Sequence, residues 1–112
     1  MMRSLLTLPD KLKVLVVCGR NRKRSLTAEV LFKNHPHIIV RSAGVSSAAR
    51  HVVSHRDIAW ADQIWCMEEK HARKLRELFP EVISVKILDI PDEYAFMDAE
   101  LIELLTEESM NV

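Results

Sequence analysis

Hydrophobic residues occur along this chain in short runs that are separated by polar segments. Residues 14–17 form an unbroken apolar run, and residues 38–40 form a second one. A run without polar interruption is typical of a strand in the middle of a parallel sheet, where helices cover both faces. We therefore predict strands at 13–17, 38–40, 62–67 and 84–88.

Helical spacing and helix-boundary residues occur between and after these strands. The first helix is predicted to end near residue 34, because Pro36 cannot continue it. Ser54 and Asp57 have the spacing of a capping box for a short helix that ends near residue 61. A longer helix starts near Glu68, and Asp98 caps the last helix. The inward-facing positions are predicted to be Ala28, Leu31 and Phe32 in the first helix, Ala72, Leu75, Leu78 and Phe79 in the third, and Leu101, Leu104 and Leu105 in the last.

The order of these elements predicts a single α/β domain that spans residues 1–112. Strands and helices alternate, so consecutive strands are expected to be parallel and to be joined by right-handed crossovers. A chain of 112 residues can bury one core and little more. Residues 1–10, with a turn at Pro9 and Asp10, are expected to be a loose lead-in to the first strand. Residues 45–53 have no clear periodicity and are expected to form a loop.

The composition is that of a globular protein without a strong overall charge. Hydrophobic residues make up 48% of the chain and charged residues 29%. The formal net charge is zero, so no whole-chain field attracts nucleic acid or membrane, although residues 11–24 are basic and residues 89–108 are acidic. The short apolar patch near the N-terminus has the length of neither a signal peptide nor a membrane span. We expect a cytoplasmic protein with no membrane partner.

The cysteines and histidines predict neither a disulfide framework nor a metal site. Cys18 and Cys66 are far apart in the sequence, and a thiolate enzyme needs a reducing compartment. Cys66 falls within the third predicted strand and is expected to be a buried packing residue. The five histidines do not have metal-ligand spacing with the cysteines, and His35 and His37 are expected to flank a surface turn. No metal and no other cofactor is expected.

The strongest chemical signal lies at residues 18–25, in the sequence CGRNRKRS. A buried strand, a tight loop and a helix start form an anion site, because backbone N–H groups and the helix dipole attract negative charge. Cys18 opens the loop in a positive field that favours a thiolate, and Arg24 closes it with a guanidinium that can bind two phosphate oxygens. Alternatively, Cys18 is a small buried hydrophobic residue and the basic loop is a solvated turn. The Arg-Ser pair and the helix that follow favour the phosphate site.

This stretch resembles the active-site loop of the low molecular weight protein tyrosine phosphatases, whose signature is Cys-x5-Arg-Ser between the first strand and the first helix. The resemblance implies that Cys18 is the nucleophile that becomes a phosphocysteine and that Arg24 binds phosphate. It further implies that Ser25 supports the thiolate and that Asn21 maintains the shape of the loop. The implied fold has three layers, with a four-stranded parallel sheet in the order 2-1-3-4 and helices on both faces. The implied substrate-binding residues are Gly19, Arg20, Asn21, Arg22, Lys23, Arg24 and Ser25.

Two further segments extend this resemblance. Ser42 begins a Ser-Ala-Gly segment after the second strand and is expected to contact Asn21, as the corresponding serine of the family does. Residues 91–94 resemble the family's general-acid loop, which makes Asp92 the implied acid and Tyr94 a candidate aromatic wall for the substrate. Asp89, which directly follows the fourth strand, is the alternative acid. The chain departs from the family pattern in its shortened specificity region at 45–53 and at Arg20, Lys23 and Leu26.

The function predicted from these residues is that of a phosphomonoester hydrolase, a cysteine-dependent protein tyrosine phosphatase. Its partners would be a phosphotyrosine protein or another aryl phosphate, and inorganic phosphate or sulfate would fit the loop. Acidic substrates are expected to be preferred because Arg20, Arg22 and Lys23 add positive charge. A non-catalytic module that binds RNA or polyphosphate is one alternative, although nucleic acid is not the expected partner. An arsenate reductase is less favoured, because Cys66 is the one other cysteine available for a redox relay.

Overall fold

The computed structural model describes residues 11–112, so the lead-in predicted at 1–10 lies outside the described residues. Four strands form a sheet: β1 (Leu12–Cys18), β2 (Ile38–Gly44), β3 (Gln63–Cys66) and β4 (Lys86–Ile87). The strands are ordered β2-β1-β3-β4, and each neighbouring pair is parallel. The predicted parallel sheet and its strand order are confirmed.

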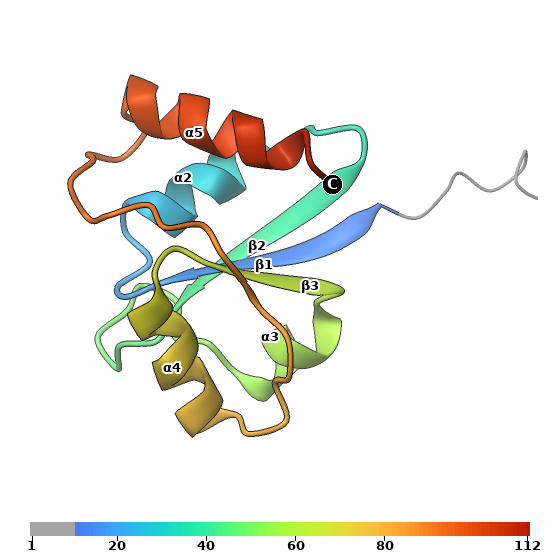
Figure 1. Ribbon diagram of the computed structural model, residues 1–112, viewed down its shortest axis with the longest axis vertical. Coiled ribbons are helices and arrows are strands. Elements are labelled where there is room, and N and C mark those ends of the chain that lie inside the picture. The colour runs from blue at the N-terminus through green and yellow to red at the C-terminus, as the bar shows by residue number, and fades with distance from the viewer. Residues whose placement is uncertain (1–10) are drawn as a thin grey trace, which may run out of the picture.

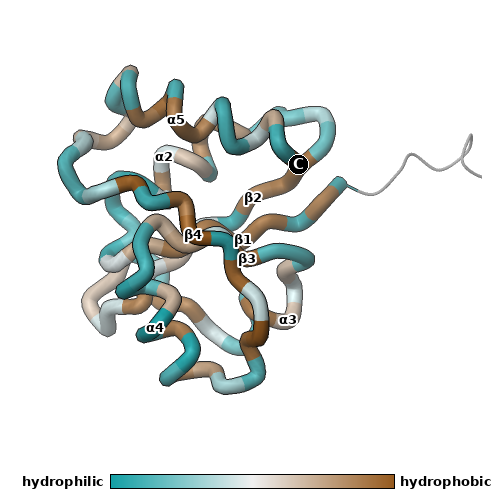
Figure 2. The backbone as a smooth tube through the Cα atoms, viewed as in Figure 1, coloured by the Kyte–Doolittle hydropathy of each residue, from teal (hydrophilic) through white to brown (hydrophobic). Residues whose placement is uncertain are grey.

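Helices cover both faces of this sheet. They are α2 (Arg24–Leu31), α3 (His55–Trp60), α4 (Glu69–Leu78) and α5 (Ala99–Ser109). Figure 1 shows α2 and α5 on one side of the strands and α3 and α4 on the other, which gives the three layers expected. In Figure 2 hydrophobic segments gather where the strands cross the centre of the molecule, whereas hydrophilic segments lie mainly on the outer helices.

Strand β1 contributes to two hydrophobic cores, because its successive side chains point to opposite faces of the sheet. Val14 and Val16 pack with residues of α2 and α5, while Leu15 and Val17 pack with residues of α3, α4 and the segments beside them. All four valine and leucine side chains are fully buried. This double burial explains why β1 is apolar at every position from 14 to 17.

Several element boundaries differ from those predicted. Helix α2 ends at Leu31 rather than near residue 34, and turns continue the chain to Pro36. Strand β2 extends beyond residue 40 to Gly44, because its pairing with β1 continues to the last residue of each strand, where Gly44 is paired with Cys18. Strand β4 contains two residues rather than five, since it lies at the sheet edge and pairs with β3 over two positions.

The predicted helix caps are confirmed, but one inward position is wrong. Ser54 and Asp57 form a capping box at α3, and the Asp98 carboxylate accepts from backbone N–H groups at the start of α5. Leu78 was expected to face the core, yet it is 43% exposed. Helix α4 ends at Leu78, and the next residue, Phe79, turns inward in its place at 7% exposure.

Candidate active site

A cleft of about 700 Å³ opens where β1 ends and α2 begins. The chain leaves β1 for β2 on one side and later returns to β3 on the other side, so this cleft lies at the point where the strand order reverses. Ligands of parallel α/β sheets bind preferentially at such a point. The residues that line the cleft are Cys18, Gly19, Arg20, Asn21, Arg22, Lys23, Arg24, Val45, Lys70, His71 and Asp92.

The sulfur of Cys18 is surrounded by hydrogen-bonding groups of the following loop. Its Sγ lies 2.9 Å from Ser25 Oγ and accepts the backbone N–H of Asn21 at 3.2 Å. The Asn21 side chain donates to Ser25 Oγ at 2.8 Å, which leaves the serine hydrogen available to the sulfur. Asn21 has a φ of 58°, a left-handed conformation that asparagine tolerates better than most residues. The loop therefore presents hydrogen-bond donors to the sulfur of a buried residue, since Cys18 is 3% exposed.

The guanidinium of Arg24 is fixed by groups that are distant in the sequence. Its Nη1 donates to Glu68 Oε1 at 2.6 Å and to the carbonyl oxygen of Ile90 at 2.8 Å. Its Nε lies 3.8 Å from Asp92 Oδ1. Partial burial raises the pKa of the Glu68 carboxyl, but the hydrogen bond and charge of Arg24 outweigh this effect, so that the pKa lies below its usual value. An ionised Glu68 holds Arg24 in one orientation.

His71 lies beside this pair and faces the same cleft. Its Nδ1 accepts the backbone N–H of Glu68 at 3.1 Å, so the proton of the neutral ring is assigned to Nε2. Burial and, secondarily, the charge of Arg24 lower the pKa of His71 from 6.5 to about 4. The ring is therefore uncharged at neutral pH and adds a hydrogen-bond donor to the cleft.

The two candidate acids occupy different positions. The Asp92 side chain is 58% exposed and lines the cleft together with Cys18. Asp89 follows β4 in a left-handed conformation with a φ of 57° and is not part of the cleft lining. Tyr94 does not form the aromatic wall considered for the substrate: its hydroxyl donates to Glu100 at 3.1 Å, and its ring packs against the core beneath α2 and α5.

The predicted contact between Ser42 and Asn21 is wrong. Both the backbone N–H and the hydroxyl of Ser42 donate to Glu29 Oε1, at 2.9 and 2.5 Å. A carboxylate accepts stronger hydrogen bonds than an amide oxygen, and Glu29 on α2 lies close enough to β2 to provide one. Asn21 Oδ1 is consequently buried without a hydrogen-bond partner in the described part of the chain.

The shortened segment at 45–53 supports the Cys18 loop through its backbone. Val45 and Ser46 donate to the carbonyl oxygens of Cys18 and Gly19, each at 3.0 Å. The backbone N–H of Arg50 donates to the Arg20 carbonyl at 3.0 Å, and its side-chain Nε donates to the Asn21 carbonyl at 3.3 Å. Nothing in the sequence indicated these contacts, whereas Glu68 could have been suspected because it follows a strand at the same sheet edge as Cys18.

Other chemically notable side chains lie away from the cleft. Cys66 is fully buried in the core that faces α3 and α4, and burial raises the pKa of its thiol to about 12, so its predicted packing role is confirmed. His35 Nδ1 accepts the backbone N–H groups of His37 and Ile38 in the turn before β2. Within residues 11–112 no group of three His, Cys, Asp or Glu side chains is arranged to hold a metal ion. None of the helices α2 to α5 in this same range has the length and apolar character needed to span a bilayer.

Comparison with known proteins identifies relatives of this chain. The low molecular weight protein-tyrosine-phosphatase Wzb of Salmonella typhi is 33% identical over 114 aligned positions, which cover 73% of this chain and 76% of the relative. No family model matches the chain.

Solved structures share its fold. Wzb of Vibrio vulnificus, in complex with benzylphosphonate, superposes with a TM-score of 0.73 at 23% identity, over 92% of this chain and 100% of that one. A low molecular weight protein tyrosine phosphatase from Streptococcus pyogenes has a TM-score of 0.72 at 17% identity, over 89% of each chain. The YwlE arginine phosphatase of Geobacillus stearothermophilus has a TM-score of 0.60 at 22% identity, over 89% and 94%. At these identities the likeness concerns the fold.

Proposed function

Because the chain belongs to the low molecular weight protein-tyrosine-phosphatase family, we propose that it hydrolyses phosphomonoesters through a phosphocysteine intermediate on Cys18. The proposed substrate is a phosphotyrosine protein or another aryl phosphate. The observation that supports this proposal most strongly is the environment of the Cys18 sulfur, with Ser25 Oγ at 2.9 Å and the Asn21 N–H at 3.2 Å, at a cleft lined by Arg24. Such donors stabilise a thiolate nucleophile. A reducing, cytoplasmic setting is part of the proposal, because oxidation would inactivate that thiolate.

In the first proposed step, Cys18 Sγ attacks phosphorus and the bond to the leaving oxygen breaks. Backbone N–H groups of the loop and the remaining nitrogens of Arg24 bind the phosphoryl oxygens during this transfer. Glu68 and the Ile90 carbonyl occupy Nη1 of Arg24. This leaves for the substrate Nη2 and the Nε that lies 3.8 Å from Asp92 Oδ1. The guanidinium is thus oriented before the substrate arrives, and little ordering cost remains at the moment of reaction.

Asp92 is proposed to protonate the leaving phenolate in this step. Its position in the cleft lining, near Arg24, supports it over Asp89. In the second step a water molecule attacks the phosphocysteine, the sulfur–phosphorus bond breaks, and Asp92 accepts the proton that the water gives up. Inorganic phosphate leaves, and Cys18 returns as a thiolate.

The alternative of an arsenate reductase receives no support from the position of the second cysteine. Cys18 belongs to the core on the α2 and α5 side of the sheet, whereas Cys66 belongs to the core on the other side. Because Cys66 is fully buried and its thiol has a raised pKa, it is a poor partner for disulfide exchange. A phosphatase requires no second cysteine, and this function is therefore the one we propose.

The test of the nucleophile compares turnover with binding. We expect Cys18→Ser to reduce the hydrolysis of p-nitrophenyl phosphate by at least about a thousandfold, because a serine hydroxyl is not ionised at neutral pH. Binding of inorganic phosphate should persist, measured by calorimetry, because the loop N–H groups and Arg24 remain. Cys66→Ser is the matched control and should retain activity. A Cys18→Ser protein with wild-type turnover would falsify the mechanism, and a wild-type protein that binds phosphate without turnover would point to the non-catalytic module.

The test of the acid uses leaving groups of different basicity. Asp92→Asn should lose about a hundredfold or more in kcat on phenyl phosphate and much less on p-nitrophenyl phosphate, whose phenolate departs without a proton. Asp89→Asn is the matched control, and its kcat should fall equally little on phenyl phosphate and on p-nitrophenyl phosphate. If the selective loss occurs in the Asp89→Asn protein instead, the acid is Asp89, and if it occurs in neither, this loop does not supply the acid.

A further inference from the structure

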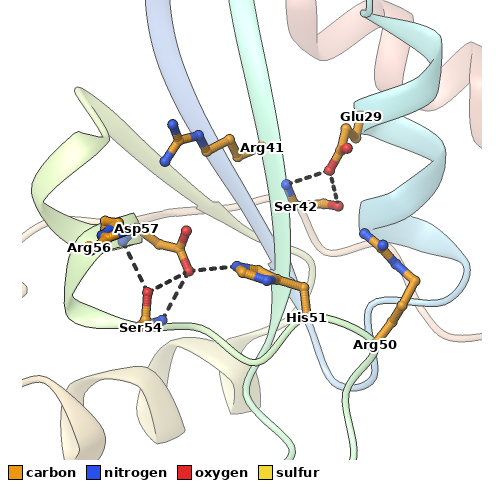
Figure 3. Close-up of a pocket in the computed structure, with 8 residues that line it drawn as sticks. All are labelled: Glu29, Arg41, Ser42, Arg50, His51, Ser54, Arg56 and Asp57. Carbon is orange, nitrogen blue, oxygen red and sulfur yellow. Dashed lines mark hydrogen bonds and ion pairs between the residues drawn. The ribbon is translucent and has the colours of Figure 1, made fainter.

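A second cleft, of about 680 Å³, opens along the edge strand β2 and shares no lining residue with the Cys18 cleft. It lies between α2, β2, the 45–53 loop and the start of α3. Figure 3 shows the His51 ring directed toward Asp57, with Arg50 on the other side of His51 and with Arg56 beside Asp57. Three arginines thus border one cleft that the proposed phosphatase reaction does not use.

The two carboxylates of this cleft already accept several hydrogen bonds from the protein. Glu29 Oε1 accepts the backbone N–H and the hydroxyl of Ser42. Asp57 Oδ2 accepts the backbone N–H of Ser54 at 3.0 Å and its hydroxyl at 3.1 Å, and it lies 2.9 Å from His51 Nε2. Both carboxylates are therefore bonded to these donors and not to the arginines.

The three arginines have no carboxylate partner within 4.0 Å among residues 11–112. The guanidinium of Arg41 lies over the Trp60 ring, 4.3 Å from its centre, which limits its motion while its N–H groups remain available. Arg50 donates through Nε to the Asn21 carbonyl, so its two Nη groups are left for a ligand. Arg41 and Arg50 are thus held in position without an anion, and such guanidinium groups are suited to bind one.

We propose that this cleft is a second oxyanion site that binds a phosphate group. Planar guanidinium groups match the oxygen geometry of phosphate and bind it through paired hydrogen bonds. The cleft is much larger than a bare phosphate ion and falls within the size range of ligand sites, so it also has room for the group that carries the phosphate. The phosphate therefore comes either from free inorganic phosphate or from a second phosphorylated side chain of the protein substrate.

Arg50 connects this cleft with the Cys18 loop. Its side chain borders the second cleft, while its backbone N–H bonds the carbonyl oxygen of Arg20 and its Nε bonds that of Asn21. A phosphate held by Arg50 would thus bind beside the loop that holds the first phosphate. This placement suits a substrate that carries two phosphates, and in this respect the inference rests on the proposed function.

The site itself is tested by titrating the full-length protein with inorganic phosphate while amide resonances are followed by NMR. We expect two saturable responses, one at residues 19–25 and one at residues 50–57. The double variant Arg41→Gln, Arg56→Gln should weaken the second response at least tenfold and leave the first unchanged. Arg73→Gln, Arg76→Gln on α4 is the matched control and should leave both unchanged. A response confined to residues 19–25, or one at 50–57 that the double variant does not alter, would overturn the proposal.

The source of the phosphate is tested by turnover of tyrosine peptides that carry one or two phosphates. If the second phosphate occupies this cleft, KM for the doubly phosphorylated peptide should be about tenfold higher in the Arg41→Gln, Arg56→Gln protein than in the wild type. KM for the singly phosphorylated peptide should not change. Equal KM values together with the NMR response would assign the cleft to free phosphate. Turnover of phenyl phosphate should be unchanged in either case, so these outcomes are separate from the Cys18→Ser result that tests the proposed function.

Discussion

The buried imidazole of His71 is expected to make the folded protein sensitive to acid. The pKa of His71 is about 4 in the folded protein, against 6.5 for an unperturbed histidine. Below pH 6.5 the unfolded chain therefore binds a proton that the folded protein does not bind, and stability falls as the pH is lowered. The loss levels off below about pH 4, where the folded protein is protonated as well. Since one pKa unit corresponds to 1.36 kcal/mol, the full effect of this ring is about 3 kcal/mol.

The variant His71→Asn isolates this contribution. An asparagine side-chain oxygen can still accept the backbone N–H of Glu68, the N-cap residue of α4, but asparagine does not titrate. Between pH 7 and pH 4 we expect the variant to lose about 3 kcal/mol less free energy of unfolding than the wild type, and at pH 5 the difference should already be about 2 kcal/mol. Urea unfolding at pH 7, 6, 5 and 4 measures this, with the fluorescence of the fully buried Trp65 as the signal.

Comparing the change in stability with pH, rather than the stability at one pH, removes the effects of titratable groups that do not interact with His71. His55→Asn, at a ring of α3 that is 77% exposed, is measured alongside as the control for a histidine-to-asparagine change outside the cleft. If the curves of wild type and His71→Asn run parallel from pH 7 to pH 4, His71 is not held neutral by the fold and the reasoning fails.

Three further outcomes are expected. Replacing Arg20 and Arg22 with glutamine should raise KM for acidic phosphopeptides about fivefold at low salt and much less for phenyl phosphate, because exposed charges act through a screened field. Equal effects on both KM values in steady-state kinetics would contradict the expected preference for acidic substrates. Glu68→Gln should lower kcat/KM about tenfold by releasing Arg24, whereas Glu68→Asp should retain part of the wild-type kcat/KM. Unchanged kinetics in Glu68→Gln would mean that the ion pair does not position the arginine. Leu101→Ala, which empties a fully buried position, should cost about 3 kcal/mol in urea unfolding, while the exposed Leu78→Ala should cost less than about 0.5 kcal/mol.

Local patterns in the sequence were sufficient to predict much of the fold. The apolar run at 14–17 predicted a central strand because each of its side chains is buried against one core or the other. The cap residues Ser54 and Asp98 predicted helix starts because a cap is satisfied by backbone groups within three residues. Leu78 was assigned wrongly because helical periodicity does not show where the helix ends.

Contacts between distant segments could not be predicted in the same way. Ser42 was expected to reach Asn21, but the choice between that amide and the Glu29 carboxylate depends on how closely α2 packs on β2. The bond from Arg50 to the Asn21 carbonyl likewise depends on the path of a short loop without periodicity. Both contacts join residues more than ten positions apart, and local spacing carries no information about them.

The charges that line the cleft show why the net charge of the whole chain is a poor guide to its ligands. The net charge is zero, yet five cationic side chains and one carboxylate line the Cys18 cleft, namely Arg20, Arg22, Lys23, Arg24 and Lys70 against Asp92. The compensating acidic residues are concentrated elsewhere, with four glutamates on α5 alone. None of the α5 glutamates lines the cleft, and salt at 0.1 M screens exposed charges beyond about 10 Å. The cleft can therefore attract an anionic substrate although the whole molecule is neutral, and this attraction must weaken as salt is added.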